Sequence, residues 1–168
     1  MQPTHPRSPS AQALGLVFWL VLAYITAAIG AIASINAPEF YGQLMQPIWA
    51  PPAWLFGPVW TTLFTMMGIA AWLVWRSAPW DATRGTLVLF VVHLAVNALW
   101  SWLFFAWNLG LWAFFELLLL WVLIAALIAG FWRFSRVAAL LLVPYLCWVT
   151  FAGALNFWLW RNNAPWLG

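Results

Sequence analysis

Charged residues are scarce in this chain of 168 residues. They make up 5% of the sequence, as six arginines, no lysine and three acids, whereas soluble domains carry about a quarter. A chain with so few charges cannot cover a water-facing surface. The arginines are also scattered, and nucleic-acid binding requires a clustered basic face. The composition therefore excludes a soluble domain and a nucleic-acid partner.

Cysteine and histidine are scarce too. Cys147 is the only cysteine and lies in an apolar run, which excludes an intrachain disulfide and a cysteine-built metal site. His93 is the only histidine in an apolar run, so one chain cannot supply two axial haem ligands. His93 is either a single haem ligand or, as we favour, a hydrogen-bonded histidine between helices. The absence of an H-E-x-x-H motif, a glycine-rich phosphate loop and a catalytic triad argues against a hydrolase.

Apolar residues, by contrast, make up 67% of the sequence, and its mean hydropathy is +0.93. A membrane-spanning helix needs about 20 predominantly apolar residues. Five segments qualify: 13–35, 53–75, 84–106, 110–132 and 137–160. Since helices satisfy every backbone group internally, the sequence predicts an all-α membrane protein, a five-transmembrane-helix bundle. Residues 13–168 are expected to form this single domain, after a disordered, polar and proline-rich segment at 1–12.

Arginines gather on one side of the predicted bundle. Five spans place the two chain ends on opposite sides, and the side of the N-terminus holds Arg7, Arg76, Arg84, Arg133 and Arg136. Only Arg161 lies on the opposite side, which is the outer face. Because cytoplasmic loops carry the excess of arginine and lysine, we expect the N-terminus inside and the C-terminus outside.

The connection between the first two spans, residues 36–52, is long and rich in proline. Structureless connections of more than about 12–15 residues are uncommon unless they serve a functional site. Prolines stiffen such a segment, and Pro51 and Pro52 stand where the start of a helix tolerates proline. We expect a structureless but stiff lid over the outer face, which contains Tyr41 and Trp49.

Polar side chains and deep tryptophans gather beneath this lid. Most of the 17 tryptophans lie near span ends, where aromatic belts form. Helix rise places Trp148 about 18 Å below the outer face and a larger set within about 13 Å of it: Trp60, Asn97, Trp100, Glu116 and Asn156. Two interpretations stay open, namely an aromatic-walled cavity, or hydrogen bonds between helices made by Asn97, Ser101 and Asn156. Glu116 is expected to be protonated or paired.

Three segments together resemble one family of membrane proteins. They read WAPPAWLFGPVW (49–60), NALWSWLFF (97–105) and PYLCWVTFAGALNFWLWR (144–161). Their combination, with five spans in matching order over almost the whole chain, is similar to the tryptophan-rich sensory protein family. That family includes the mitochondrial translocator proteins, also called peripheral-type benzodiazepine receptors.

The resemblance implies a function. It implies a receptor or transporter, often a homodimer, for tetrapyrroles such as protoporphyrin IX and haem, and for cholesterol and isoquinoline or benzodiazepine drugs. Such proteins are linked to porphyrin transport and to regulation of tetrapyrrole biosynthesis or of stress and oxygen responses. No cofactor is required, since porphyrin or haem would be the ligand. An inner bacterial membrane is the default location, and an outer membrane has mitochondrial precedent.

The resemblance also implies a ligand site with the first connection as its lid. Its residues correspond to Tyr41, Trp49, Pro51, Trp60, Phe64, Asn97, Trp100 and Trp148. In the family, light-dependent porphyrin breakdown is attributed to tryptophans that match Trp60 and Trp148, which makes these two the catalytic candidates. The alternatives to a receptor or transporter are therefore enzyme-like photooxidation and a ligand-regulated signalling scaffold.

Sterols and porphyrin carboxylates would use other elements. The family's cholesterol motif matches at Leu155 and Arg161, but Phe157 replaces the expected tyrosine, which argues against tight sterol binding there. Porphyrin carboxylates are expected near Arg161 and the N-terminal ends of the second and fourth spans, where helix dipoles are positive.

Small residues recur along the first span, at Ala23, Ala27 and Ala31. Such a row lets two helices approach closely. The approach takes place either in a homodimer or inside the bundle, and the third span is a second possible dimer surface.

Overall fold

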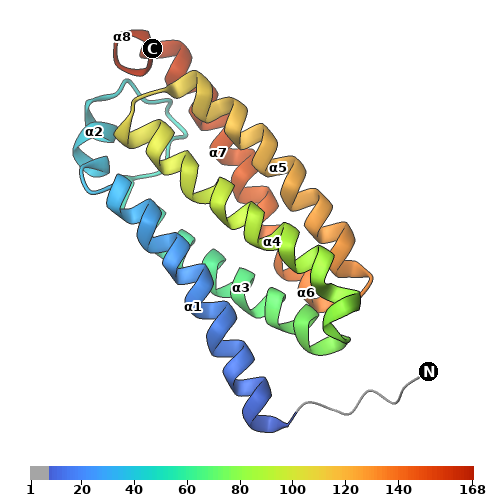
Figure 1. Cartoon of the computed structure of the whole chain (residues 1–168). Helices are drawn as coiled ribbons and strands as arrows, with labels where there is room; N and C mark the ends of the chain where they lie inside the picture. Colours follow the sequence, from blue (N-terminus) through green and yellow to red (C-terminus); the bar gives the residue numbers. More distant parts are fainter. Residues whose placement is uncertain (1–7) are drawn as a thin grey trace.

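Five helical spans in the described part of the chain, residues 8–168, are long and apolar enough to cross a membrane. They run Pro9–Ala33, Ala53–Ser77, Trp80–Ala106, Gly110–Trp132 and Arg136–Asn162. In this computed structural model they lie side by side in one elongated bundle (Figure 1). The predicted five-helix membrane fold is therefore confirmed.

Three of the spans are built from two elements each, and short helices cover the end that holds the C-terminus. The elements are α1 (Pro9–Ala33), α2 (Ala37–Gln43), η1 (Ala53–Leu55), α3 (Phe56–Ser77), α4 (Trp80–Ser101), η2 (Trp102–Ala106), α5 (Gly110–Trp132), α6 (Arg136–Leu141), α7 (Val143–Asn162) and α8 (Ala164–Leu167). The η2 segment is a π-helix, an irregularity that is frequent at functional sites.

Local sequence explains where the first and last spans begin and bend. The Ser8 side chain accepts the backbone N–H of Ala11 at 3.3 Å, and Pro9 fills the first turn of α1, where its missing N–H is not needed. Residues 9–12, predicted to be disordered, are therefore helical, while residues 1–7 of that segment lie outside the described residues. The last span breaks at Leu142, because Pro144 lacks the N–H that would continue the helix.

The first connection is not structureless, as the sequence predicts, because residues 37–43 form α2. Pro38 lies in the first turn of α2, a position that proline tolerates, so the prolines of this connection did not exclude a helix. Pro52 caps η1, which confirms the predicted helix start. The α2 helix lies at the outer end of the bundle (Figure 1), and residues 36–52 are called the lid.

Two helix pairs flank α4. The α1 helix packs along α3 and α4, while α5 packs along α4 and α7, and α3 also contacts α6. Gly68 brings α1 and α3 together, since a Cβ there would lie 3.1 Å from the Cα of Leu20 and 3.2 Å from the carbonyl oxygen of Trp19. Of the small residues predicted to allow close helix approach, Ala23 is fully buried inside the bundle, Ala27 is half-buried and Ala31 is exposed.

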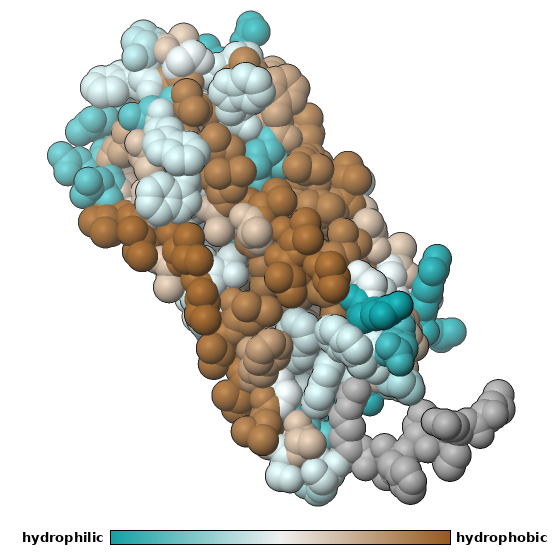
Figure 2. Space-filling view, in the orientation of Figure 1, coloured by the Kyte–Doolittle hydropathy of each residue, from teal (hydrophilic) through white to brown (hydrophobic). Residues whose placement is uncertain are grey.

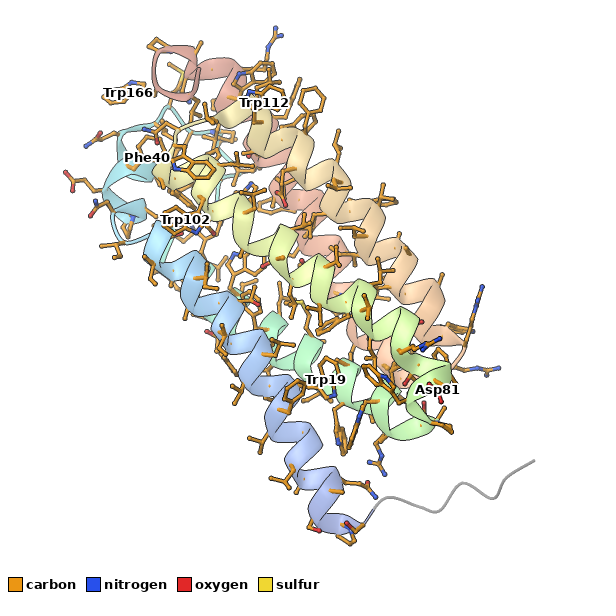
Figure 3. The ribbon with its side chains drawn as sticks, in the orientation of Figure 1. Trp19, Phe40, Asp81, Trp102, Trp112 and Trp166 are labelled. Carbon is orange, nitrogen blue, oxygen red and sulfur yellow. The ribbon has the colours of Figure 1, made fainter. Side chains whose placement is uncertain are left out.

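The surface has the polarity of a membrane-embedded molecule. Apolar side chains cover the middle of the bundle and polar ones concentrate at its two ends (Figure 2). Asp81 marks one end, and Trp112 and Trp166 mark the other (Figure 3). At the Asp81 end the Arg76 guanidinium lies 4.5 Å from the centre of the Trp72 ring, an arrangement suited to a membrane interface.

Candidate functional site

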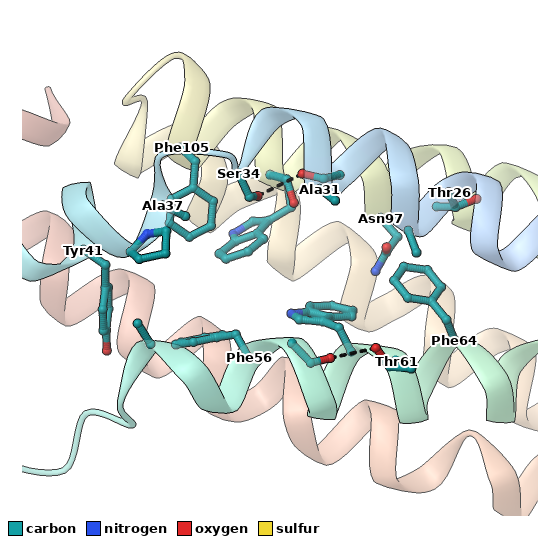
Figure 4. Close-up of a pocket in the computed structure, with 18 of the residues that line it drawn as sticks. Thr26, Ala31, Ser34, Ala37, Tyr41, Phe56, Thr61, Phe64, Asn97 and Phe105 are labelled. Carbon is teal, nitrogen blue, oxygen red and sulfur yellow. Dashed lines mark hydrogen bonds between the residues drawn. The ribbon is translucent and has the colours of Figure 1, made fainter.

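A cavity of about 390 Å³ lies between α1, α3 and α4, beneath α2. Aromatic side chains of α2, α3, α4 and η2 line it, namely Tyr41, Phe56, Trp60, Phe64, Trp100 and Phe105. The α1 side is narrow and is formed largely by Ala27, Gly30, Ala31 and Ser34. Figure 4 shows Tyr41 and Phe56 toward the lid, and Phe64 and Asn97 at the deeper end. Both size and lining suit a hydrophobic ligand, because small-molecule sites measure about 300–1,000 Å³ and are mostly apolar.

Most of the predicted ligand residues meet at this cavity. Tyr41, Trp60, Phe64, Asn97 and Trp100 all line it, although they come from α2, α3 and α4. Helix periodicity explains the grouping, since Trp60 and Phe64 are four residues apart on α3, and Asn97 and Trp100 are three apart on α4.

The other three predicted residues lie behind the cavity. Trp148 packs against Phe56, which does line the cavity, with ring centres 5.8 Å apart. Trp49 and Pro51 both belong to the lid: the Trp49 ring packs against Phe151 with centres 5.8 Å apart, and Pro51 is buried. Of the two catalytic candidates, Trp60 therefore touches the cavity and Trp148 does not. The buried indole N–H of Trp148 has no hydrogen-bond partner among the described residues.

A buried polar network fixes the deep end of the cavity. The amide of Asn97 donates to the Tyr145 hydroxyl at 2.7 Å, and that hydroxyl lies 3.0 Å from Nε2 of His93. Nδ1 of His93 is 3.2 Å from the carbonyl oxygen of Phe90. A consistent assignment has Tyr145 donating to Nε2 and Nδ1–H donating to Phe90. Both nitrogens of His93 are thus occupied and His93 does not line the cavity, which matches the helix–helix histidine and not a haem ligand.

A second hydrogen-bonded chain orients the Trp100 indole. Its Nε1–H donates to Oδ1 of Asn156 at 3.2 Å, and the Asn156 amide donates to the carbonyl oxygen of Gly110 at 2.8 Å. The Trp100 ring also stacks on Phe104, with ring centres 5.5 Å apart and planes 14° apart. Both interpretations of the polar residues are therefore partly right: Asn156 joins helices, whereas Asn97 joins helices and also lines the cavity.

The lid is held down by hydrogen bonds to its own backbone and to α7. The Tyr41 hydroxyl donates to the carbonyl oxygen of Pro51 at 3.2 Å, and burial raises the pKa of this phenol, so it remains a donor at neutral pH. Asn163 accepts the N–H of Met45 at 2.7 Å and donates to the carbonyl oxygens of Met45 at 2.9 Å and Leu159 at 3.0 Å. Asn163 therefore ties the middle of the lid to the end of the last span.

Replacing Asn163 with alanine is expected to loosen the lid and to destabilise it by about 1 kcal/mol, because the part-buried N–H of Met45 loses its acceptor. Faster hydrogen exchange at residues 44–50 would measure this. Asn162→Ala is the matched control, since the Asn162 side chain bonds only the carbonyl oxygen of Trp158 in its own helix. Equal exchange in the two variants would contradict the proposed tie.

Two ionisable residues singled out in the sequence, Arg161 and Glu116, do not line the cavity. Arg161 is exposed, with its guanidinium 5.9 Å from the centre of the Trp160 ring, and it does not line the cavity, so its expected role with porphyrin carboxylates is not supported. Glu116 is buried on α5, and within residues 8–168 neither carboxyl oxygen has a hydrogen-bond partner. The same described residues include no group of three His, Cys, Asp or Glu side chains that could hold a metal ion.

Sequence reasoning missed the α1 wall, Phe56 and Asn163. Phe56 looked like an ordinary span residue, and only its contact with Trp148 and the cavity reveals its position. The alanines of α1 were noticed, but a row of small residues does not say which neighbour it faces. Asn163 lies beyond the last span, where polar residues are common and do not indicate a specific contact.

The fold and the cavity define a multi-pass membrane protein that binds hydrophobic ligands. The TspO/MBR family matches residues 16–161. Tryptophan-rich protein TspO of Chlorobaculum tepidum is 41% identical over 144 residues, covering 81% of this chain and 89% of that protein. The translocator protein of Homo sapiens is 38% identical, covering 77% and 78%, and protein CrtK of Rhodobacter capsulatus is 38% identical, covering 89% and 95%. The chain belongs to the TspO/MBR family, and its bacterial relatives support a bacterial membrane protein.

Proposed function

We propose that this cavity binds tetrapyrroles, with protoporphyrin IX as the representative ligand, and that the protein serves as their membrane receptor or transporter. The observation that carries the proposal is an aromatic-walled cavity inside a membrane bundle, with indoles from two helices, Trp60 and Trp100. A flat, polarisable ring gains about 0.5–1.5 kcal/mol from each well-placed aromatic contact beyond the burial of its area. Haem, sterols and hydrophobic drugs would use the same apolar walls.

The ligand carboxylates would lie toward the N-terminal end of the second span. Ala53, Phe56 and Gly57 from its first turns line the cavity, so the positive end of the helix dipole lies beside it. The start of α5, by contrast, does not contribute to the cavity. This arrangement keeps the end of the second span that the sequence suggested, and leaves out Arg161 and the start of the fourth span.

Titration of the purified protein in lipid nanodiscs with protoporphyrin IX, followed by tryptophan fluorescence, tests the proposal. We expect saturable quenching with one site per chain. The dimethyl ester of protoporphyrin IX is expected to bind about two- to fivefold more weakly, because it loses the attraction of the helix end. Quenching that rises without saturation would contradict a specific site, whereas equal affinity of acid and ester would remove only the role of the helix end.

Binding alone does not separate a transporter from a ligand-regulated scaffold. We favour a receptor or transporter, since the cavity lies within the bilayer where a hydrophobic ligand partitions. Porphyrin flux into proteoliposomes measures this directly. Flux supports transport, and intact binding without flux supports the scaffold.

Topology and assembly are further proposals. Arg76 and Arg84 flank the second connection and Arg133 and Arg136 the fourth, both on the side of the N-terminus, which favours the N-terminus inside. A C-terminal reporter found outside the cell would agree with this orientation. A homodimer would use the exposed apolar face of α4, at Val88, Val91 and Val92.

A further inference from the structure

Some of the residues that line the cavity are exposed on the surface of the bundle, and they show where the cavity opens. Its exposed lining residues on the long helices are Tyr24 and Ala31 of α1, and Gly57 and Thr61 of α3. On the α4 wall, by contrast, Asn97 and Trp100 are buried. The opening therefore lies between α1 and α3.

This opening faces the bilayer and not the outer solution. Counted from the outer ends of their spans, Gly57 lies about 6 Å deep and Tyr24 about 14 Å deep, within the apolar belt. On α1, the exposed apolar side chains Val21, Ile25 and Ile32 lie within one helical turn of the lining residues Tyr24 and Ala31. An open apolar groove on the surface of α1 also shares Tyr24 with the cavity, so a lipid-facing surface runs directly to the opening.

The two possible routes into the cavity are closed to different degrees. The outer route is covered by α2 and by the lid, which Asn163 ties to α7 through two bonds to Met45. Between α1 and α3 the side-chain closure is a single bond of 2.7 Å from the Tyr24 hydroxyl to Oγ1 of Thr65. Thr65 donates its own proton to the carbonyl oxygen of Thr61 at 2.8 Å, so the Tyr24 hydroxyl is the donor in this bond.

We propose that hydrophobic ligands reach the cavity sideways from the bilayer, between α1 and α3, past a latch formed by Tyr24 and Thr65. The space beside Gly57 is open, since a Cβ there would meet no atom within 4 Å. A ligand that dissolves in lipid thus never has to displace the lid. This route rests on the proposed function of the cavity as a ligand site.

Stopped-flow quenching by protoporphyrin IX in nanodiscs, with equilibrium titration alongside, tests the latch. Tyr24→Phe and Thr65→Val both remove the bond between these two side chains, and Thr65→Val also removes the bond to Thr61. Association and dissociation should become about fivefold faster in both variants. Kd should stay within about twofold in Thr65→Val, because Thr65 does not line the cavity. Thr62→Val is the matched control, because the Thr62 hydroxyl bonds only the carbonyl oxygen of Pro58 and does not line the cavity. Wild-type rates in both latch variants, with binding intact, would overturn the latch.

A side chain at Gly57 tests the opening itself. Gly57→Leu is expected to slow both association and dissociation by about tenfold or more, since it obstructs the route without a clash in the closed fold. Gly153→Leu is the control, because its Cβ is equally unobstructed and Gly153 does not line the cavity. Unchanged association in Gly57→Leu, with only faster dissociation, would overturn the route and leave the binding site standing.

The entry route can also be tested without ligand. This measurement still gives an answer if protoporphyrin IX does not bind and the proposed function is wrong. A spin label on Thr61→Cys, in a Cys147→Ser background, reports which solvent reaches the opening. We expect collisions with lipid-soluble oxygen to dominate, whereas a label on Glu39→Cys of α2 should collide mainly with a water-soluble nickel chelate. Nickel collisions at Thr61 equal to those at Glu39 would overturn the bilayer route.

Discussion

Replacing Trp60 with leucine is expected to weaken the binding of protoporphyrin IX by about thirtyfold or more, as truncation of a central aromatic anchor does. The Trp60 ring lines the cavity and is held by Phe64, with ring centres 5.6 Å apart, and by Tyr145 at 6.2 Å. Leucine maintains the α3 helix but removes the flat surface on which a tetrapyrrole rests. Equilibrium titration in nanodiscs measures the change in Kd.

The matched controls for this prediction are two other tryptophans. Trp112 is exposed on α5 and does not line the cavity, so Trp112→Leu should leave Kd unchanged. Trp148→Leu acts only through Phe56 and should have a smaller effect than Trp60→Leu. Wild-type affinity in Trp60→Leu combined with lost binding in Trp148→Leu would place the ligand behind Phe56, outside the cavity described above.

Replacing Tyr145 with phenylalanine is expected to lower the free energy of unfolding by about 2–4 kcal/mol. The hydroxyl is fully buried between α4 and α7, where it accepts from Asn97 at 2.7 Å and lies 3.0 Å from Nε2 of His93. Phenylalanine fits the same space but leaves two buried polar groups without their partner. Thermal or denaturant unfolding in a defined detergent measures the loss.

Tyr24→Phe is the matched control for Tyr145→Phe. It deletes a tyrosine hydroxyl from an exposed position, where the average hydrogen bond between membrane helices contributes about 0.6 kcal/mol. Equal stability of the Tyr145→Phe variant and the unmodified protein would show that the network does not join α4 to α7. The same variant should also lower ligand affinity, since the freed Asn97 amide lines the cavity.

The spans and their order follow from the sequence because hydropathy and backbone hydrogen bonding leave few alternatives in a membrane. The predicted bounds of the fourth span, 110–132, agree with both ends of α5, Gly110–Trp132. The helix α2 was not predicted, because prolines and glycine around Tyr41 suggested irregular backbone, and burial of Tyr41 against the bundle outweighed that preference. Local propensity is weakest where tertiary packing decides.

The sequence predicted how deep the site residues lie along their helices, but not which neighbouring helices their side chains face. Counting 1.5 Å per residue places Trp60 and Trp100 in the half of the bundle nearest the lid, where both line the cavity, and Trp148 near the middle. It does not say which pair of neighbouring helices each indole faces, and that direction separates Trp60 and Trp100 from Trp148. The α1 wall was hidden for a different reason, since alanine and glycine carry no chemical signal of a ligand site.

The Asn163 tie and the Tyr24 latch depend on contacts between residues far apart in the chain. Met45 and Asn163 are separated by 118 residues, and Tyr24 and Thr65 by 41. No local pattern marks either pair. They emerge only when the helices are placed in space.

A crystal structure of the protein with bound protoporphyrin IX tests the central claim most directly. We predict that the macrocycle lies between Trp60 and Trp100 beneath α2, with one edge toward the opening at Ala31 and Gly57. A macrocycle bound outside the bundle, or beside Trp148 with the α1–α3–α4 cavity empty, would contradict it.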